Sequence, residues 1–149
     1  MRLIRPWLYV GKLTETQNPG WLWARGIGAM LQLAGAVPQP GIESLYVDVE
    51  DGESLPPDAL QQGMDFVRAQ HALGKIVLIA CGAGISRSAT FAIAALKEIE
   101  DLPLLDAWRL VKANHPDALP HPALWESLCH YYDEDIPLTA FLAAIRAGG

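Results

Sequence analysis

Residues 75–96, KIVLIACGAGISRSATFAIAAL, join an apolar run to an alanine-rich run through a short loop. The continuous apolar run at 75–80 is typical of a strand buried on both faces of a sheet. From Ser88 to about Glu100 the apolar residues follow helical spacing. A cysteine, two glycines and an arginine occupy the junction, so we predict a strand that enters a helix through a chemically active loop.

The rest of the chain divides at prolines, glycines and changes of apolar period. Asn18 as a cap, Pro19 as first residue and Gly26 as a stop predict a short helix. Alternation predicts short strands at residues 7–13, 29–34 and 44–49. We expect further helices at residues 56–73, 104–114, 122–132 and 137–147. Strands alternate with helices first and helices follow, which predicts an α/β fold, a single domain over residues 1–149 with a central, mostly parallel sheet flanked by helices.

Composition narrows the class of protein. The 149 residues are 51% hydrophobic and 19% charged, as in ordinary globular proteins. A net charge of −6 offers no basic field for nucleic acid or an anionic membrane, so we expect neither as a partner. No window approaches the ~20 apolar residues of a membrane span, and Pro6 and Lys12 interrupt any secretory signal. Two cysteines make no disulfide framework, and we expect a cytoplasmic protein.

The loop after the strand combines a nucleophile with a phosphate cradle. Backbone N–H groups at a helix start lack partners and, with the helix dipole, form an anion site. Gly82 and Gly84 permit the unusual backbone angles that such a loop needs. Arg87 can hold two oxygens of a phosphoryl group, and the same N–H groups favour a thiolate at Cys81. We therefore interpret the loop as reactive and not as a structural cysteine beside a surface arginine.

Two nucleotide-binding motifs do not fit this loop. A dinucleotide fingerprint needs a third glycine where the chain has Arg87, and it belongs to an opening βαβ unit. A nucleotide P-loop needs Gly-Lys-Ser/Thr, but no lysine lies between Lys75 and Lys97.

The stretch CGAGISRSAT (81–90) resembles the C-x5-R signature of cysteine-dependent phosphatases, and its A-G-x-S-R-S form that of dual-specificity phosphatases. WLYVGKL (7–13) is similar to that family's opening segment and VEDGES (49–54) to its aspartate-bearing loop. AWRLVKANHPDALPHPALWESL (107–128) is similar to the segment after the signature. The resemblance covers residues 5 to 133, and it implies the fold of these phosphatases.

An acid must protonate the leaving oxygen in such a reaction. The stretch VDVEDGES (47–54) offers four carboxyl groups: Asp48, Glu50, Asp51 and Glu53. The resemblance favours Asp51, thirty residues before the cysteine. Alternation over residues 47–49 also places Asp48 within a strand and not beyond its end. Asp48 is the main alternative.

The resemblance implies a two-step hydrolysis through a phosphocysteine. Cys81 would attack phosphorus, Asp51 would act as acid and then as base, and Ser88 would assist the leaving thiolate. An alternative for Ser88 is a plain helix start. The expected phosphate-binding residues are Gly82, Ala83, Gly84, Ile85, Ser86 and Arg87.

The chain departs from the family at Ala80, where a histidine usually precedes the cysteine. That histidine orders the loop and keeps the thiol ionised, so we expect slower catalysis or a shift to higher pH. A phosphorylated protein or a small phosphomonoester is the expected substrate, and the absence of lysine in the loop disfavours phosphoinositides. Two rivals are a rhodanese-like sulfurtransferase and a non-catalytic phosphate-binding module. The sequence does not predict an oligomeric state.

Other chemistry-bearing residues receive structural interpretations. His115, His121, Cys129 and His130 match no zinc spacing, so we expect no metal and no cofactor. Cys129 is interpreted as a buried small hydrophobe. The tryptophans are expected in the core or in helix packing: Trp7, Trp21, Trp23, Trp108 and Trp125.

Overall fold

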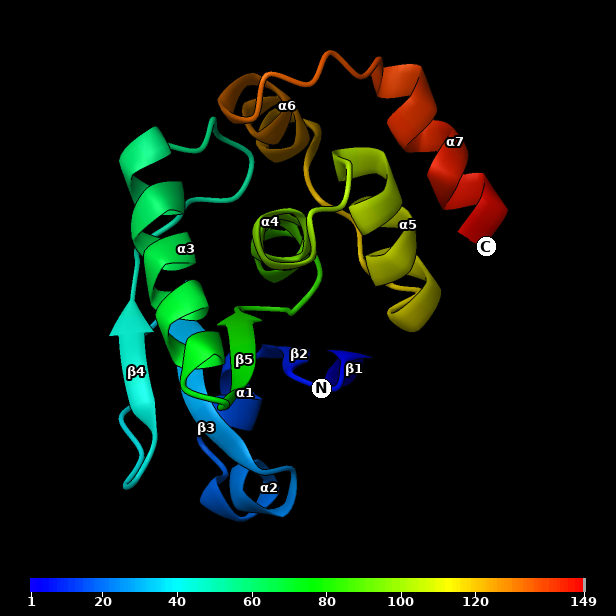
Figure 1. The fold of residues 1–149 in the computed structure, drawn as a ribbon. Helices are drawn as coiled ribbons and strands as arrows, with labels where there is room; N and C mark the ends of the chain where they lie inside the picture. The colour runs from blue at the N-terminus through cyan, green and yellow to red at the C-terminus, as the bar shows by residue number, and fades with distance from the viewer. Residues whose placement is uncertain (149) are drawn as a thin grey trace.

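The computed structural model, which describes residues 1–148, contains one five-stranded sheet (Figure 1). The strands stand in the order β1-β2-β5-β3-β4. Their bounds are Arg2–Arg5 (β1), Leu8–Lys12 (β2), Ile27–Gln32 (β3), Glu43–Tyr46 (β4) and Ile76–Cys81 (β5). In this sheet β1 pairs antiparallel with β2, and the β2–β5, β5–β3 and β3–β4 pairs are parallel. The predicted α/β class with a mostly parallel sheet is confirmed.

Helices lie on both faces of the sheet. Their bounds are Leu13–Thr16 (α1), Pro19–Ala24 (α2), Pro57–Ala72 (α3), Arg87–Glu100 (α4), Leu104–Asn114 (α5), Pro122–Tyr131 (α6) and Leu138–Gly148 (α7). Helices α3 and α4 contact the central strands, α5 contacts β1, and α6 and α7 pack on α4 and α5. In Figure 1, α4 lies at the centre with α3, α5 and α6 around it.

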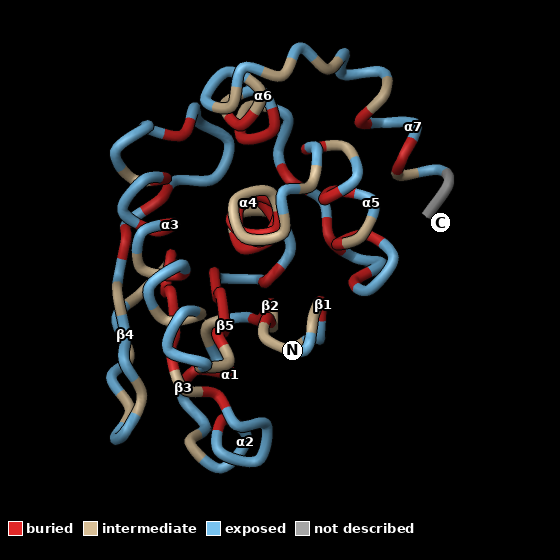
Figure 2. The backbone as a smooth tube through the Cα atoms, in the orientation of Figure 1, coloured by how far each residue is buried: buried red, intermediate tan, exposed pale blue. Residues whose placement is uncertain are grey.

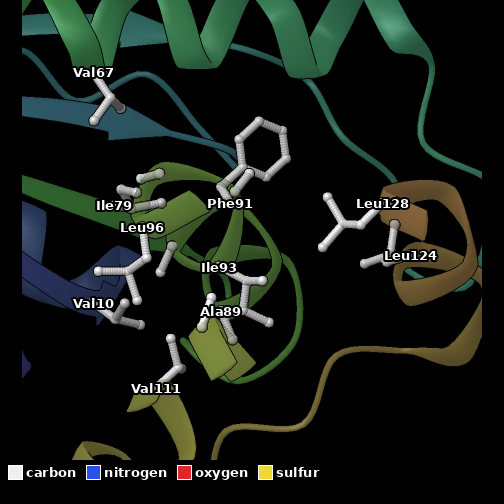
Figure 3. Close-up of a cluster of buried hydrophobic side chains, with 14 of the residues drawn as sticks. Val10, Val67, Ile79, Ala89, Phe91, Ile93, Leu96, Val111, Leu124 and Leu128 are labelled. Carbon is white, nitrogen blue, oxygen red and sulfur yellow. The ribbon is translucent and has the colours of Figure 1, made fainter. Parts of the chain in front are cut away.

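Alternation along β5 divides the core in two. Val77, Ile79 and Cys81 join the large cluster under α3 and α4, whereas Leu78 and Ala80 join a smaller cluster beside α2. The large cluster includes side chains from β5, α4 and α6 (Figure 3). Residues 88–96 of α4 are all buried, so the helix is held from every side (Figure 2). The predicted strand buried on both faces is therefore confirmed, as is the helix that follows it.

Most element predictions are confirmed, and the local signals explain why. Asn18 caps α2 by accepting a hydrogen bond from the Trp21 N–H at 3.2 Å, and Pro19 is the first helical residue. The prediction for two tryptophans is wrong. Trp21 and Trp23 are 49% and 60% exposed, because α2 is a short helix that buries only Leu22.

Parallel strands bring their carboxyl ends to one edge of the sheet, where α/β proteins place their sites. β5 is the central strand, and its last residue is Cys81. Among residues 1–148, no helix is long and apolar enough to cross a membrane.

Candidate active site

Cys81 lies at the bottom of the candidate site. It ends β5 and is only 2% exposed. Its Sγ lies 3.2 Å from the Oγ of Ser88, which is itself fully buried in the first turn of α4. The thiol donates in this contact, and the hydroxyl can donate in return once the sulfur is ionised. The first turn of α4 thus places the Ser88 hydroxyl beside the sulfur.

The cysteine loop, residues 82–86, curls between β5 and α4. Gly84 has a φ of +72°, and a Cβ there would stand 2.9 Å from the backbone C and O of Gly11 in β2. Only glycine fits both restraints, so the end of β2 sets the shape of the loop. Among residues 1–148, no backbone carbonyl accepts from the N–H groups of residues 82–86. These donors, at the positive end of α4, are available to an anion.

Arg87 is fixed above the loop by the chain that carries the acidic residues. Its Nη1 donates to the carbonyl oxygen of Val49 at 3.0 Å. Its Nη2 lies beside Gly82, where a Cβ would approach it to 3.0 Å. The remaining N–H groups of the guanidinium can still hold an oxyanion.

Asp51 is brought over the loop by Ser86. The Ser86 hydroxyl donates to Asp51 Oδ1 at 2.6 Å and accepts from the backbone N–H of His121 at 2.9 Å. One hydroxyl therefore joins three segments: the cysteine loop, the acidic loop and the start of α6. Asp51 and Cys81 line the same cavity.

Asp48 has a different environment. The prediction that it lies within a strand is wrong, because β4 ends at Tyr46. Val47 and Val49 nevertheless bury their side chains and donate backbone hydrogen bonds to Gln32 and Leu33, so the alternation persists beyond the strand. The pKa of the Tyr46 phenol is raised by burial and by the charge and hydrogen bond of Asp48. Asp48, unlike Asp51, does not line the cavity that Cys81 lines.

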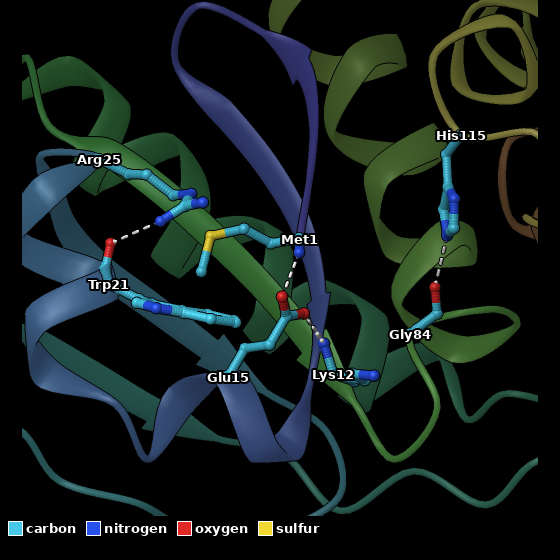
Figure 4. Close-up of polar contacts among 7 residues, drawn as sticks. All are labelled: Met1, Lys12, Glu15, Trp21, Arg25, Gly84 and His115. Carbon is cyan, nitrogen blue, oxygen red and sulfur yellow. Dashed lines mark hydrogen bonds and ion pairs between the residues drawn. The ribbon is translucent and has the colours of Figure 1, made fainter.

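His115 contacts the cysteine loop, which sequence reasoning missed. Its Nε2 lies 2.7 Å from the carbonyl oxygen of Gly84, and its side chain is turned toward the loop (Figure 4). The residue is only 7% exposed, and its Nδ1 has no partner in the described part of the chain. Ala80, by contrast, packs in the apolar cluster beside α2. An imidazole therefore reaches the loop from the end of α5 and not from position 80.

A cavity of about 540 Å³ opens above the cysteine. One wall is polar and holds Asp51, Ser86 and Arg87. The other lining side chains are mostly apolar and form a wall that extends to α7, a contribution that the sequence did not predict. Its side chains come from three segments: Ile85, Leu119, Phe141, Leu142 and Ile145.

Of the other residues considered as metal ligands, His121 lines the cavity, whereas Cys129 and His130 lie apart from it. Among residues 1–148, no group of three or more His, Cys, Asp or Glu side chains could hold a metal ion. His121 Nδ1 accepts from the Ala123 N–H at 3.0 Å and so caps α6. Cys129 is half-buried, and burial, followed by the nearby carboxylates, raises the pKa of its thiol.

Residues 8–134 match the family model described as dual specificity phosphatase, catalytic domain. Human dual specificity protein phosphatase 16 is 34% identical over 123 residues, which are 79% of this chain and 18% of that protein. Mouse dual specificity protein phosphatase 14 is 32% identical over 131 residues, 83% of this chain and 65% of that protein. The chain therefore spans only part of the length of these relatives.

Solved structures agree with the family match. The crystal structure of human DUSP28 has a TM-score of 0.82 at 27% identity, over 89% of this chain and 96% of that one. The structure of DUSP15 has a TM-score of 0.78 at 23% identity, over 98% of this chain and 90% of that one, and shares the fold.

Proposed function

This chain belongs to the dual-specificity phosphatase family, and from that premise we propose that it is a protein phosphatase acting through a phosphocysteine. One arrangement carries the proposal. A buried cysteine lies under a ring of free N–H groups, with a hydroxyl 3.2 Å from its sulfur and a carboxyl group docked over the same cavity. Nucleophile, oxyanion site and proton donor are the three groups that phosphoryl transfer through a thiolate needs.

In the first step Cys81 attacks phosphorus as a thiolate. The S–P bond forms and the bond from phosphorus to the leaving oxygen breaks. Arg87 and the N–H groups of residues 82–87 hold the equatorial oxygens, where charge is greatest in the transition state. Asp51 gives its proton to the leaving oxygen, which departs as an alcohol or phenol.

In the second step water hydrolyses the phosphocysteine. Asp51, now a carboxylate, takes a proton from the water as its oxygen bonds to phosphorus. The S–P bond breaks, inorganic phosphate leaves, and the Ser88 hydroxyl donates to the departing thiolate. The position of Ser88, buried directly beside the sulfur, supports this role more than a plain helix start.

The substrate we propose is phosphotyrosine or phosphoserine/threonine in a protein. The chain carries a net charge of −6, and the segment that holds the acid also bears Asp48, Glu50 and Glu53. This field repels polyanions such as inositol phosphates or nucleic acid. We place the reaction in the cytoplasm, where reducing conditions keep both cysteines free.

The two rival functions predict different results in a simple pair of assays. A rhodanese-like sulfurtransferase would transfer sulfur from thiosulfate to cyanide and would release no phosphate. We expect release of phosphate from an aryl phosphate and no sulfur transfer. Arg87 closes the loop, and its guanidinium donates to the carbonyl oxygen of Val49. An arginine at this position suits the binding of a phosphoryl group and so favours the phosphatase over the sulfurtransferase.

A non-catalytic phosphate-binding module would bind phosphate without turnover. The test compares the wild type with Cys81→Ser and with Cys129→Ser as matched control. We expect the first substitution to abolish phosphate release and the second to leave it unchanged. Equal rates in wild type and Cys81→Ser would contradict the proposal.

A further inference from the structure

Helix α7 lies beyond residues 8–134, the part of the chain that matches the family model, yet it borders the active-site cavity. Phe141 fixes the helix in place. Its ring stacks on Trp108 at 5.2 Å and on Trp125 at 4.8 Å between centroids, and its carbonyl accepts from Trp108 Nε1 at 3.2 Å. The wall that α7 presents to the cavity is therefore anchored to α5 and α6 and is not a loose tail.

Large apolar side chains remain exposed around this cavity. Leu142 is 42% exposed, and Ile85 and Leu119 also belong to the large apolar side chains that the described chain leaves open to solvent. All three line the cavity above Cys81, and Ile145 completes the wall. Exposed apolar groups that gather at one concavity indicate a binding surface for an apolar group.

The phosphate position fixes which part of a substrate meets this surface. A phosphoryl group held by the cysteine loop and Arg87 leaves the organic part of the ester in the cavity that Asp51 and the apolar wall line. A phosphotyrosine ring is long and apolar enough to lie along such a wall, whereas a phosphoserine side chain is short and brings polar backbone instead. The side chain next to the phosphotyrosine is then the group that reaches α7.

We propose that α7 makes this site selective for phosphotyrosine flanked by a large apolar side chain, which packs on Leu142 and Ile145. This inference rests on the proposed phosphatase activity. A lipid phosphomonoester is a less suitable occupant, because the net charge of −6 and the acidic loop repel an anionic membrane surface.

The test uses two phosphotyrosine peptides that differ only in the flanking residues, leucine in one and serine in the other. We expect the wild type to show a kcat/KM about tenfold higher for the leucine peptide, the effect of burying one leucine side chain. Leu142→Asn should reduce this ratio to about twofold. Leu138→Asn is the matched control, since Leu138 lies on the same helix, is 36% exposed and does not line the cavity. It should keep the wild-type ratio.

Phenyl phosphate separates the two proposals. If the wild type releases no phosphate from phenyl phosphate or from either peptide, the proposed function fails. If it hydrolyses phenyl phosphate but shows equal kcat/KM for both peptides, only the selectivity by α7 fails. The ratio of kcat/KM for the two peptides is measured on the wild type alone. The inference can therefore be refuted even if Leu142→Asn does not fold.

Two further outcomes would overturn it. One is a wild-type ratio that Leu142→Asn and Ile145→Asn both leave intact. The other is faster hydrolysis of phosphatidic acid in phosphatidylcholine vesicles than of the leucine peptide, which would assign the wall to a lipid chain.

Discussion

The contact between His115 and the cysteine loop permits a sharp test, because two substitutions separate its hydrogen bond from its bulk. His115 Nε2 lies 2.7 Å from the Gly84 carbonyl oxygen, and both residues are buried. In His115→Gln the side-chain amide nitrogen can occupy the place of Nε2. In His115→Asn the amide ends one bond short, at the place of Nδ1, so the Gly84 carbonyl loses its donor.

The expected loss of stability follows from the burial of the Gly84 carbonyl oxygen. A buried acceptor without a partner costs about 1–3 kcal/mol, so we expect His115→Asn to lower the free energy of unfolding by about that amount. The loop that binds phosphate should also lose its fixed shape. We expect kcat/KM to fall about tenfold, which corresponds to ~1.4 kcal/mol. His115→Gln should retain most of both quantities.

The assays are urea unfolding and steady-state hydrolysis of an aryl phosphate. A positioning role predicts that the Asn variant loses kcat/KM while the Gln variant recovers it. Equal activity in both variants and the wild type would refute the assignment of loop order to His115. Equal loss in both variants would show that imidazole bulk, and not the hydrogen bond to Gly84, matters.

Three further substitutions test the general acid, the cysteine loop and the ion pair between Arg5 and Glu100. Asp51→Asn should lower kcat/KM, which reports formation of the phosphocysteine, by about 100-fold for alkyl phosphates and much less for activated aryl phosphates, while Asp48→Asn, the control, should change neither; equal losses of kcat/KM across leaving groups would exclude Asp51 as the acid. Gly84→Ala, at a φ of +72°, should lower kcat/KM by about 100-fold in a folded protein, measured beside circular dichroism; normal activity would contradict the fixed loop shape. Burial raises the pKa of Glu100, but hydrogen bonds from Arg5 and Trp7 and the Arg5 charge outweigh it and lower the pKa overall. Glu100→Gln should therefore cost about 1 kcal/mol at neutral pH, and the gap to wild type should close as the pH falls from about 5 to 3; a gap independent of pH in urea unfolding would contradict this ion pair.

Local signals made much of the fold predictable. The apolar run at β5, the cap at Asn18 and the glycine pair in the loop each act within a few residues, and each element appears where the pattern places it. Strand β1, Arg2–Arg5, escaped prediction because two of its four residues are arginines, and its pairing with β2 provides the order that its own sequence does not signal.

Contacts between residues far apart in the chain could not be predicted from local sequence patterns. His115 reaches Gly84 across 31 residues, and no local pattern distinguishes that histidine from one in a turn before proline. The apolar wall of α7 likewise depends on where Phe141 stacks, not on the helical period that predicted the helix. The position of Asp51 in the acidic loop was predicted in part. Resemblance singled out Asp51, and its contact with Ser86 then brings it over the cavity.

Trapping the intermediate tests the phosphocysteine most directly. Asp51→Asn should slow the second step, so acid quenching during hydrolysis of an activated aryl phosphate should leave phosphate on the enzyme. Peptide mass spectrometry then identifies the modified residue. We predict one phosphoryl group on Cys81 and none on Cys129. Phosphate release without any phosphorylated Cys81, or a phosphoryl group on another residue, would contradict the mechanism.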